Sequence, residues 1–400
     1  MIGPDLAKTI KNRQSCFLLG PRQVGKTTLI QDLLPKGPEI LSIPLQDPSL
    51  RSAYERDPGL LVRQLSAAKT RKTVFIDEVQ KVPELLDAVQ LLIDEGKANF
   101  ILTGSSARKL RKAGSNLLPG RVKSFHLDPL SWTESGWTDG HYIDAFAMPA
   151  SGNRVDFSLE ESMAFGSLPG IATLGDPEDR KDFLRAYANL YLEEEIRAEA
   201  LTRKVGAFSR FLELAAQESG TSPNLSKLSM EAGVSVPTIK EYYAILQETL
   251  VLERVDPYLK NARKRILSSP RYYFFDMGVR NALARLPMDA AGVNAQKGIL
   301  FEHAVVLEII RRVRASRRDW RVRFWRTAGG AEVDCIVDMG DKVIPIEIKS
   351  AQRVRMSDLK GLSIFLKDHP KAAKAGYVIT MGEAPERLAE NVFAVPWHRF

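Results

Sequence analysis

Short apolar runs alternate with segments of helical spacing through the first third of the chain. Four runs are apolar or extended enough to be strands, and two segments place apolar residues three and four positions apart, as in helices that cover a sheet. Buried strands alternating with helices predict a parallel sheet whose ligands bind at the carboxyl ends of the strands. The expected strands are residues 16–20, 39–47, 73–79 and 99–106, and the expected helices are residues 27–34 and 84–96.

Helical periodicity dominates the middle of the chain, after a turn-rich stretch at residues 133–154. From residue 225 the pattern predicts a helix-turn-helix, in which the first helix stops at Gly233 and the second begins at Thr238. Glycine permits the sharp turn of the backbone at this point. Two further helices are expected at residues 179–200 and 207–219.

The last part of the chain mixes strand and helix patterns. Its apolar runs are short and separated by turns, which predicts an α/β module of its own. Its helices are expected at residues 298–314 and 357–369, and its strands at residues 321–327, 331–339, 342–350, 376–380 and 392–396. We therefore expect three domains, at residues 1–155, 156–285 and 286–400.

A glycine-rich loop lies between the first expected strand and the first expected helix. Residues 20–27, GPRQVGKT, match the pattern GxxxxGK[ST]. Gly20 and Gly25 allow the chain to curl so that backbone N–H groups face phosphate oxygens, and Lys26 adds a positive charge between the β- and γ-phosphates. The Thr27 hydroxyl is expected to ligate Mg²⁺, and the helix adds its positive dipole end. The predicted ATP-binding residues are Gly20, Pro21, Arg22, Gln23, Val24, Gly25, Lys26, Thr27 and Thr28.

Two acids end the third expected strand. Asp77 is expected to hold Mg²⁺, and Glu78 to polarise the water that attacks ATP. The alternative is that both acids merely cap the end of a strand. Ser105, after the next strand, either contacts the γ-phosphate or caps a helix. Arg121 either stabilises transition-state charge, in its own subunit or in a neighbouring one, or is simply solvated.

Charged residues also interrupt the apolar elements of the last module. Glu302 lies on an otherwise apolar helix face, Asp334 lies inside one strand, and Glu347 and Lys349 share one face of the next. If these strands form a hairpin, Asp334 can approach Glu347, and the two carboxylates with the Ile348 carbonyl oxygen would form a Mg²⁺ site. Lys349 would then orient or activate water for attack on a phosphodiester. The alternative is a half-exposed sheet whose charges face water.

The net charge of +8 is modest for 400 residues, but the basic residues are unevenly distributed. Residues 311–326 hold eight arginines and one aspartate, and residues 260–271 hold five basic groups and no acid. Such segments form either solvated faces or phosphate-binding surfaces. Trp320 and Trp325, within the first segment, either stack on a nucleic-acid base or belong to the core.

Features of export and membrane proteins are missing from the sequence. No apolar run reaches the length of a membrane span, and the N-terminus lacks the apolar core of an export signal. Cys16 and Cys335 lie inside apolar strand-like runs, which is typical of free thiols in a reducing compartment. These features favour a cytoplasmic protein without membrane contact.

Together these motifs resemble those of AAA-type ATPases of the AAA_14/DUF4143 family, and the resemblance covers nearly the whole chain. It implies an α/β protein with a P-loop parallel sheet, a helical winged helix-turn-helix region and a small mixed α/β restriction-endonuclease-like module. That module is similar to the PD-(D/E)xK nuclease superfamily, whose helix glutamate, strand aspartate and ExK strand match Glu302, Asp334, Glu347 and Lys349. Related modules can keep the fold without cleaving. The matching segments are residues 20–29, 74–86, 102–110, 117–122, 165–171, 235–252, 268–283, 298–309, 331–338 and 344–351.

Three functions are compatible with these residues. The leading hypothesis is an ATPase that couples ATP and Mg²⁺ to DNA binding and metal-dependent DNA cleavage. In it Lys26 and Glu78 act on ATP, and the four residues of the nuclease-like pattern act on DNA. An alternative is a nucleotide-dependent switch or scaffold that binds a protein partner and cleaves nothing. A small-molecule kinase is a third hypothesis, although a glutamate directly after Asp77 favours hydrolysis. Oligomerisation is compatible with each of them.

Overall fold

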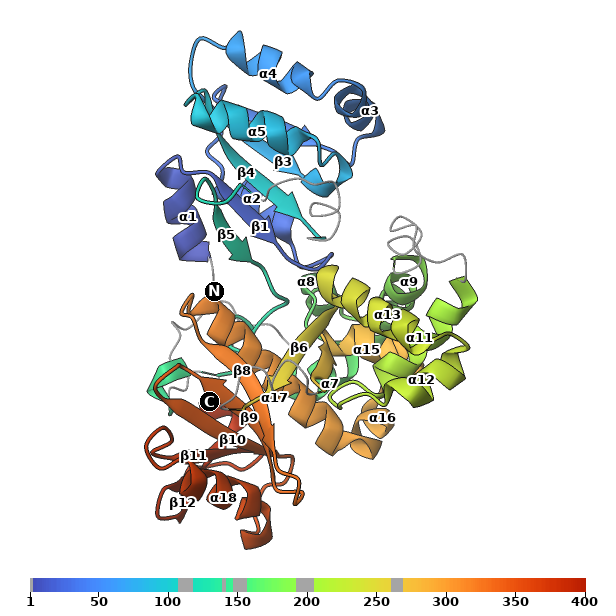
Figure 1. Cartoon of the computed structure of the whole chain (residues 1–400), viewed down its shortest axis with the longest axis vertical. Helices are drawn as coiled ribbons and strands as arrows, with labels where there is room; N and C mark the ends of the chain where they lie inside the picture. The colour runs from blue at the N-terminus through green and yellow to red at the C-terminus, as the bar shows by residue number, and fades with distance from the viewer. Residues whose placement is uncertain (1–2, 107–117, 139–141, 147–156, 192–204, 260–268) are drawn as a thin grey trace. The chain divides into compact units, whose positions relative to one another are not determined.

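The computed structural model divides the chain into two compact units (Figure 1). Unit 1 consists of Met1–Asp128 and Ala244–Val251, and unit 2 of Pro129–Tyr243 and Leu252–Phe400. The residues that the structure describes are 3–106, 118–138, 142–146, 157–191, 205–259 and 269–400.

Unit 1 contains a five-stranded sheet with the strand order β2-β3-β4-β1-β5. Every neighbouring pair is parallel, which confirms the parallel sheet predicted from the alternating pattern. The pattern did not predict β5, because Phe125 is the one buried side chain among its four residues. The strands are β1 (Cys16–Leu19), β2 (Ile40–Pro44), β3 (Lys72–Asp77), β4 (Ala98–Gly104) and β5 (Lys123–His126).

Side chains of β3 alternate between the two faces of this sheet. Val74 and Ile76 pack in one apolar cluster with Val89 of helix α5, whereas Phe75 packs in another with Ile30 of helix α2. Both faces are therefore covered, which explains why the strands read as continuous apolar runs. The helices of the unit are α1 (Gly3–Lys11), α2 (Lys26–Leu33), α3 (Pro48–Arg56), α4 (Gly59–Ser66) and α5 (Leu85–Asp94).

Two helices joined by a short turn lie where the sequence predicts a helix-turn-helix. They are α12 (Leu225–Ala232) and α13 (Val236–Glu248). Gly233 ends α12 with φ 72°, and its N–H donates to the Ser229 carbonyl at 3.1 Å, a left-handed cap that favours glycine. Helix α13 begins two residues before the predicted Thr238, because Pro237 fits the first turn of a helix, where its missing N–H costs nothing.

Further helices of unit 2 precede and follow this pair in the sequence, and the end of α13, from Ala244, belongs to unit 1. The helix predicted at residues 179–200 begins earlier, because the Asp176 side chain accepts from the Glu178 N–H and caps it. It continues as a π-helical turn at Tyr187–Tyr191, and residues 192–200 lie outside the described residues. The helices are α7 (Leu159–Phe165), α8 (Pro169–Ala172), α9 (Pro177–Ala186), α11 (Val205–Gln217), α15 (Met277–Leu283) and α16 (Ala290–Ala295).

A buried aspartate holds two of these segments together. Asp276 accepts the N–H of Ser167 at 2.7 Å and the N–H of Val279 at 3.1 Å, and it thereby caps α15. Gly166 has φ 78°, and a Cβ there would lie 2.0 Å from an Asp276 carboxylate oxygen. Two segments of the family resemblance, residues 165–171 and 268–283, therefore meet here to build the fold.

Unit 2 also contains an eight-stranded mixed sheet with the order β12-β13-β11-β10-β9-β8-β6-β7. Strands β6 and β7 pair with each other and join this sheet because β6 runs parallel to β8. The boundary expected at residue 286 therefore separates strands that belong to one sheet. The strands are β6 (Leu252–Pro257), β7 (Arg271–Phe274), β8 (Arg321–Arg326), β9 (Glu332–Asp338), β10 (Val343–Lys349), β11 (Gly376–Thr380), β12 (Glu386–Ala389) and β13 (Val392–Pro396), and the helices are α17 (Lys297–Ala315) and α18 (Lys360–Asp368).

Half of the arginines in residues 311–326 form hydrogen bonds or ion pairs in the interior of unit 2. Arg311 donates to the carbonyls of Leu130 and Phe275, and Arg312 pairs at 2.7 Å with Glu308, both side chains being almost fully buried. Arg314 pairs with Glu253 and Arg323 with Asp338, at 2.8 and 3.3 Å. Both expectations for this segment, a solvated face or a phosphate-binding surface, are wrong for these four arginines, because backbone carbonyls or carboxylates of the fold accept their hydrogen bonds or pair with them.

The remaining arginines of this segment are exposed. Arg317, Arg318, Arg321 and Arg326 lie at the surface, and Arg318 lies 4.6 Å from the centre of the Trp320 ring. Trp325 is buried in the core beside Val333, as one of its two interpretations required. Residues 260–268 of the second basic segment lie outside the described residues.

Among the helices that the structure describes, none combines the length and the apolarity that a membrane crossing requires.

Candidate functional site

The glycine-rich loop leads from β1 into α2 at the carboxyl edge of the parallel sheet. Gly20 leaves no room for a side chain, because a Cβ there would lie 2.3 Å from the Leu127 carbonyl oxygen. Gly25, directly before α2, has φ 86°, a conformation that favours glycine. The exposed Gln23 has φ 64°, so the loop curls tightly between the two elements.

The other predicted loop residues line this curl. Pro21 and Val24 are buried within it, whereas Thr28 is exposed on α2. Lys26 is 5 % exposed, and its Nζ donates to the carbonyls of Gly20 and Pro21 at 2.9 and 2.8 Å. The ammonium group therefore lies against the loop, which is where the motif requires a positive charge.

The structure brings the two predicted magnesium ligands of unit 1 together. The Thr27 hydroxyl donates to both carboxylate oxygens of Asp77, at 3.1 and 3.0 Å. Thr103 of β4 also donates to Asp77 Oδ1. A carboxylate and a hydroxyl meeting beside a phosphate loop form the hard-oxygen donor set that Mg²⁺ prefers, so these residues fit the ion.

Glu78 follows Asp77 at the end of β3, in a left-handed conformation with φ 59° and ψ 49°. Its Oε2 accepts from Gln80 Nε2 and from Ser105 Oγ, the latter at 3.1 Å. The predicted contact of Ser105 with the γ-phosphate stays a prediction, since its hydroxyl lies against Glu78. Sequence reasoning missed Gln80, because a polar residue two positions after the acid, between Val79 and Lys81, belongs to no motif.

Arg121 is not brought to the phosphate loop within this chain. It pairs with Asp94, at the end of α5, with N–O distances of 2.7 and 2.9 Å. Lys123 of β5 lies beside Cys16 at the start of β1, whereas the loop follows Leu19 at its other end. Arg121 therefore lies at the amino edge of the sheet, opposite the loop, and a role in a neighbouring subunit stays a prediction.

In unit 2, strands β9 and β10 form the hairpin on which the predicted metal site depends. Cys335 pairs with Ile346, so Asp334 and Glu347 lie opposite each other. Asp334 Oδ2 accepts from the Ile348 N–H at 2.8 Å, and Lys349 Nζ donates to Glu347 Oε1 at 2.7 Å. The hairpin alone thus gathers three of the four predicted residues, and the role of the Ile348 carbonyl stays a prediction.

Glu302 reaches this region from helix α17, with partners that sequence reasoning missed. Tyr273 donates to Glu302 Oε1 at 3.5 Å, and Arg271 Nη1 lies 3.6 Å from the same oxygen. Arg271 also pairs with Glu332 and lies 4.6 Å over the Phe324 ring. Arg271 and Tyr273 share one face of β7, an i and i+2 relation that could have marked them together.

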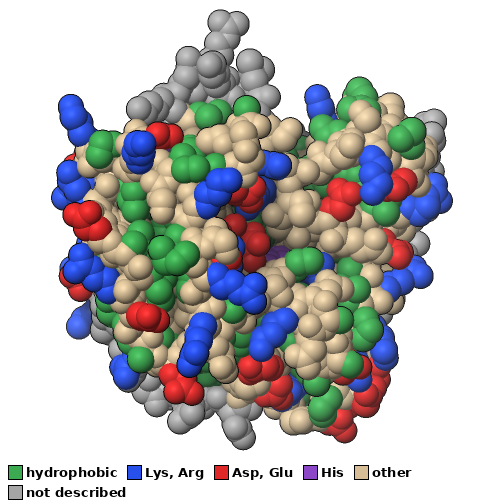
Figure 2. Space-filling view, turned by 90° about the horizontal axis from the view of Figure 1, so that it is seen from below, with side chains coloured by type: hydrophobic (Ala, Val, Ile, Leu, Met, Phe, Trp, Pro, Cys, Tyr) green, Lys and Arg blue, Asp and Glu red, His purple; other side chains and the backbone are tan. Residues whose placement is uncertain are grey.

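We call Glu302, Glu332, Asp334 and Glu347 the carboxylate cluster. Burial, and then the charge of Asp334, raise the pKa of Glu302 to about 7 and that of Glu347 to about 8. Burial also raises the pKa of Asp334, although Lys349 opposes this. On the face shown in Figure 2, acidic side chains gather near the centre with lysine and arginine side chains beside them.

One oxygen of the cluster indicates how a metal ion would fit. Glu347 Oε2 is buried and has no hydrogen-bond partner among the described residues, an arrangement that a bound cation would relieve. A three-residue metal site would need one ligand atom from each of three acidic, histidine or cysteine side chains, all within 4.8 Å of one another. Among the described residues, no such group of three includes Asp334 or Glu347. Glu302 is therefore not a third ligand in this structure, and Asp334 and Glu347 remain the two candidate Mg²⁺ ligands.

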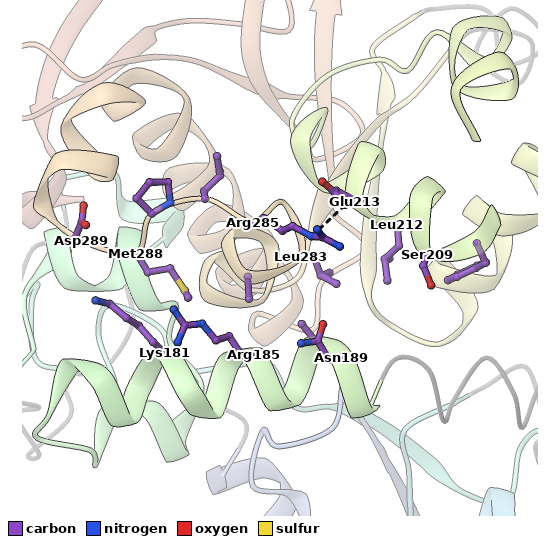
Figure 3. A pocket seen from close by; sticks show the side chains of 15 residues that line it. Lys181, Arg185, Asn189, Ser209, Leu212, Glu213, Leu283, Arg285, Met288 and Asp289 are labelled. Atoms are coloured by element: carbon purple, nitrogen blue, oxygen red, sulfur yellow. Dashed lines mark ion pairs between the residues drawn. The ribbon is translucent and has the colours of Figure 1, made fainter. Parts of the chain in front are cut away.

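A pocket of about 610 Å³ lies in the helical part of unit 2 (Figure 3). Lys181 and Arg185 line it from α9, and Arg285 pairs across its wall with Glu213 at 3.3 Å. Its buried apolar lining includes Met288. None of the predicted site residues lines this pocket, and its mixed charges select no class of ligand.

Three family models match separate parts of the chain. An AAA domain matches residues 12–136, which include the phosphate loop and its acids. A domain of unknown function (DUF8612) matches residues 156–290, and a second (DUF4143) matches residues 297–400, which include Glu302 and the β9–β10 hairpin. The AAA domain is a nucleotide-binding fold, in agreement with the loop geometry.

Two relatives align with the chain over much of their length. An uncharacterized protein of Mycobacterium tuberculosis is 25% identical over 397 residues, which cover 98% of this chain and 82% of that protein. One from Haemophilus influenzae is 20% identical, over 72% of this chain and 68% of its own.

Solved structures resemble the chain only weakly. The Pif1 helicase of Candida albicans aligns with a TM-score of 0.24 and 13% identity, over 47% of each chain. A DNA polymerase III gamma subunit-related protein of Thermotoga maritima aligns with a TM-score of 0.27 and 12% identity, over 62% of this chain and 99% of that one. These likenesses carry no argument about function.

Proposed function

The chain is a member of the family that joins an AAA domain to a DUF4143 domain, and we propose that it hydrolyses ATP with Mg²⁺ at residues 20–28. The observation that carries this proposal is the contact of Thr27 with Asp77. These residues come from separate elements fifty positions apart, yet their oxygen atoms meet beside Lys26. This meeting of a hydroxyl and a carboxylate beside the loop supports the binding of a phosphate-bound cation.

Each residue of the loop site has its own role in the proposal. The backbone N–H groups of the curled loop and the Lys26 ammonium hold the phosphates. Thr27 and Asp77 would hold Mg²⁺, which neutralises charge on the phosphate oxygens when it is bound. Glu78 orients the attacking water and accepts its proton.

Magnesium-dependent release of phosphate from ATP tests this proposal. We expect wild-type turnover to stop with excess EDTA, and the variant Asp77→Asn to lower turnover by about 10²-fold or more. Asp94→Asn is the matched control, because Asp94 is an exposed acid of the same unit that pairs with Arg121. Equal turnover by wild type and Asp77→Asn would remove the assignment of the metal ligand.

A second activity, metal-dependent cleavage of DNA, is favoured by the carboxylate cluster. Asp334 and Glu347 would hold Mg²⁺, which supplies Lewis-acid chemistry at a phosphodiester. Lys349, hydrogen-bonded to Glu347, orients the attacking water. We assign DNA contact to the exposed arginines of residues 311–326, because arginines neutralise phosphate charge, whereas α13 carries one lysine and two glutamates.

Nicking of plasmid DNA in the presence of Mg²⁺ or Mn²⁺ tests the second activity. Asp334→Asn and Lys349→Ala are expected to lose nicking while they retain ATP turnover, because the loop site is untouched. Asp341→Asn, in the exposed turn between β9 and β10, is the control and is expected to nick like wild type. Equal nicking by all preparations would indicate contamination and remove the nuclease assignment. Absent nicking with intact ATP turnover would support the nucleotide-dependent switch that binds a protein partner.

A further inference from the structure

We infer that Gln80 is a positioning residue that aims Glu78 during ATP hydrolysis, an inference that rests on the ATPase activity proposed above. Gln80 lies in a 3₁₀ turn (Val79–Lys81) directly after Glu78, and it is 3% exposed. It belongs neither to the phosphate-loop motif nor to the pair of acids at the end of β3. Its side chain nevertheless turns back to the Glu78 carboxylate.

Three side chains form a closed set of hydrogen bonds. Gln80 Nε2 donates to Glu78 Oε2 and, at 3.0 Å, to Ser105 Oγ. The Ser105 hydroxyl in turn donates to Glu78 Oε2 at 3.1 Å. Both donors act on the same carboxylate oxygen, and none of the described residues donates to Oε1. The carboxylate is therefore fixed in orientation, and Oε1 remains the oxygen that can accept from a water molecule.

The backbone around Glu78 supports the same geometry. The Glu78 N–H donates to Thr103 Oγ1 at 3.0 Å, and that hydroxyl donates to Asp77. One threonine thus connects the backbone of the proposed base to the proposed magnesium ligand. Glu78 keeps a left-handed conformation that is unfavourable for a glutamate, and such strain persists where surrounding contacts determine it.

A purely structural role does not account for Gln80. Its Oε1 is buried without a hydrogen-bond partner among the described residues, which costs stability. A Cβ at Gly104 would lie 3.0 Å from this oxygen, so the glycine after Thr103 leaves the space that the amide occupies. An amide retained at such a cost is better explained by the donor that it offers to Glu78.

Steady-state kinetics of two substitutions test the inference. Gln80→Glu keeps the shape of the side chain but replaces its donor with a carboxylate that repels Glu78, whereas Gln80→Met removes both polar atoms without adding charge. We expect kcat to fall by about 10- to 100-fold in both variants, with KM for ATP and the affinity for a non-hydrolysable analogue within about twofold of wild type. Gln64→Met is the matched control, because Gln64 is exposed on α4 and contacts Tyr54 instead; its kcat should equal that of wild type.

The contrary outcomes are distinct. Unchanged kcat in both Gln80 variants would overturn the inference, and so would a joint fall of kcat, nucleotide affinity and unfolding temperature, which indicates a structural role. Ser105→Ala should lower kcat in the same direction, and its combination with Gln80→Met should be less than additive, since both donors act on one oxygen. If wild type binds ATP but does not turn it over, the proposed ATPase activity fails instead.

Discussion

The phosphate-loop site of unit 1 and the carboxylate cluster of unit 2 both gather acids at strands, but they balance charge differently. In the loop site, Asp77 accepts from Thr27 and Thr103, and Glu78 accepts from Gln80 and Ser105. In the cluster, four carboxylates share Lys349 and Arg271, and the pKa of two of them is raised to about 7 and about 8.

This difference separates two ways of building an acidic site. Hydroxyl and amide donors satisfy the loop site without adding charge, so its geometry is ready before any ligand binds. The carboxylates of the cluster repel one another, and binding of a proton or a cation reduces this repulsion. Substitutions of Asp77 or Glu78 in the first site should therefore change activity with little effect on stability, whereas substitutions in the second site should also change stability.

The largest effect is expected from Glu78→Gln in the loop site. The amide retains the size of the side chain but cannot accept a proton from water, so kcat for ATP should fall by about 10²- to 10⁴-fold. The unfolding temperature should stay close to that of wild type. A marked stabilisation would break the comparison, because it would mean that Glu78 is repelled by its surroundings as the cluster residues are.

In the cluster, Arg271→Leu should destabilise the fold. The substitution leaves Glu302 and Glu332 without their shared cation and should lower the free energy of unfolding by about 2 kcal/mol. This loss is smaller than that for a fully buried ion pair, because both glutamates are partly exposed. Arg326→Leu removes the exposed partner of the same Glu332 and should cost about 0–1 kcal/mol. Urea unfolding measures both, and equal losses would contradict the buried role of Arg271.

The pH dependence of stability sharpens the comparison further. The fold raises the pKa of Glu302 from its ordinary value of 4.5 to about 7, so the folded protein binds this proton more tightly than the unfolded chain. The stability that the protonated Glu302 contributes is therefore fully present below pH 4.5 and is lost as the pH rises through about 7. Glu302→Gln removes this loss, so the variant should gain about 1 kcal/mol over wild type between pH 5 and pH 8. Unfolding midpoints measured in EDTA across that range test it, and parallel curves would contradict it.

The smallest effect is expected from Arg121→Ala. Arg121 pairs with Asp94 at the edge of the sheet opposite the loop, so kcat and KM should not change. A large loss of kcat that depends on protein concentration would instead show that Arg121 acts on the site of a neighbouring subunit.

Many residues of both sites could be predicted, because a motif or the alternation of a strand places them directly. The loop between β1 and α2 places Thr27, and the end of β3 places Asp77, once the sheet is known to be parallel. The alternation in β10 placed Glu347 and Lys349 on one face, and a hairpin was enough to bring Asp334 opposite Glu347.

The remaining site residues depend on contacts distant in sequence. Arg271 reaches Glu332, sixty-one positions later, only because β6 and β7 join the sheet of β8 and β9. Gln80 contacts Glu78 together with Ser105, which follows the neighbouring strand β4. The arginines of residues 311–326 read as one basic surface, but burial divides them, since Arg312 faces the interior and Arg318 faces solvent.

Equilibrium binding and hydrolysis of ATP by wild type and Lys26→Ala test the central claim most directly. Lys26 lies against the loop carbonyls and supplies its positive charge. The account predicts that wild type binds ATP with Mg²⁺ and releases phosphate, and that Lys26→Ala, though folded, loses both. It is contradicted if well-folded wild-type protein neither binds nor hydrolyses ATP, or if Lys26→Ala behaves identically.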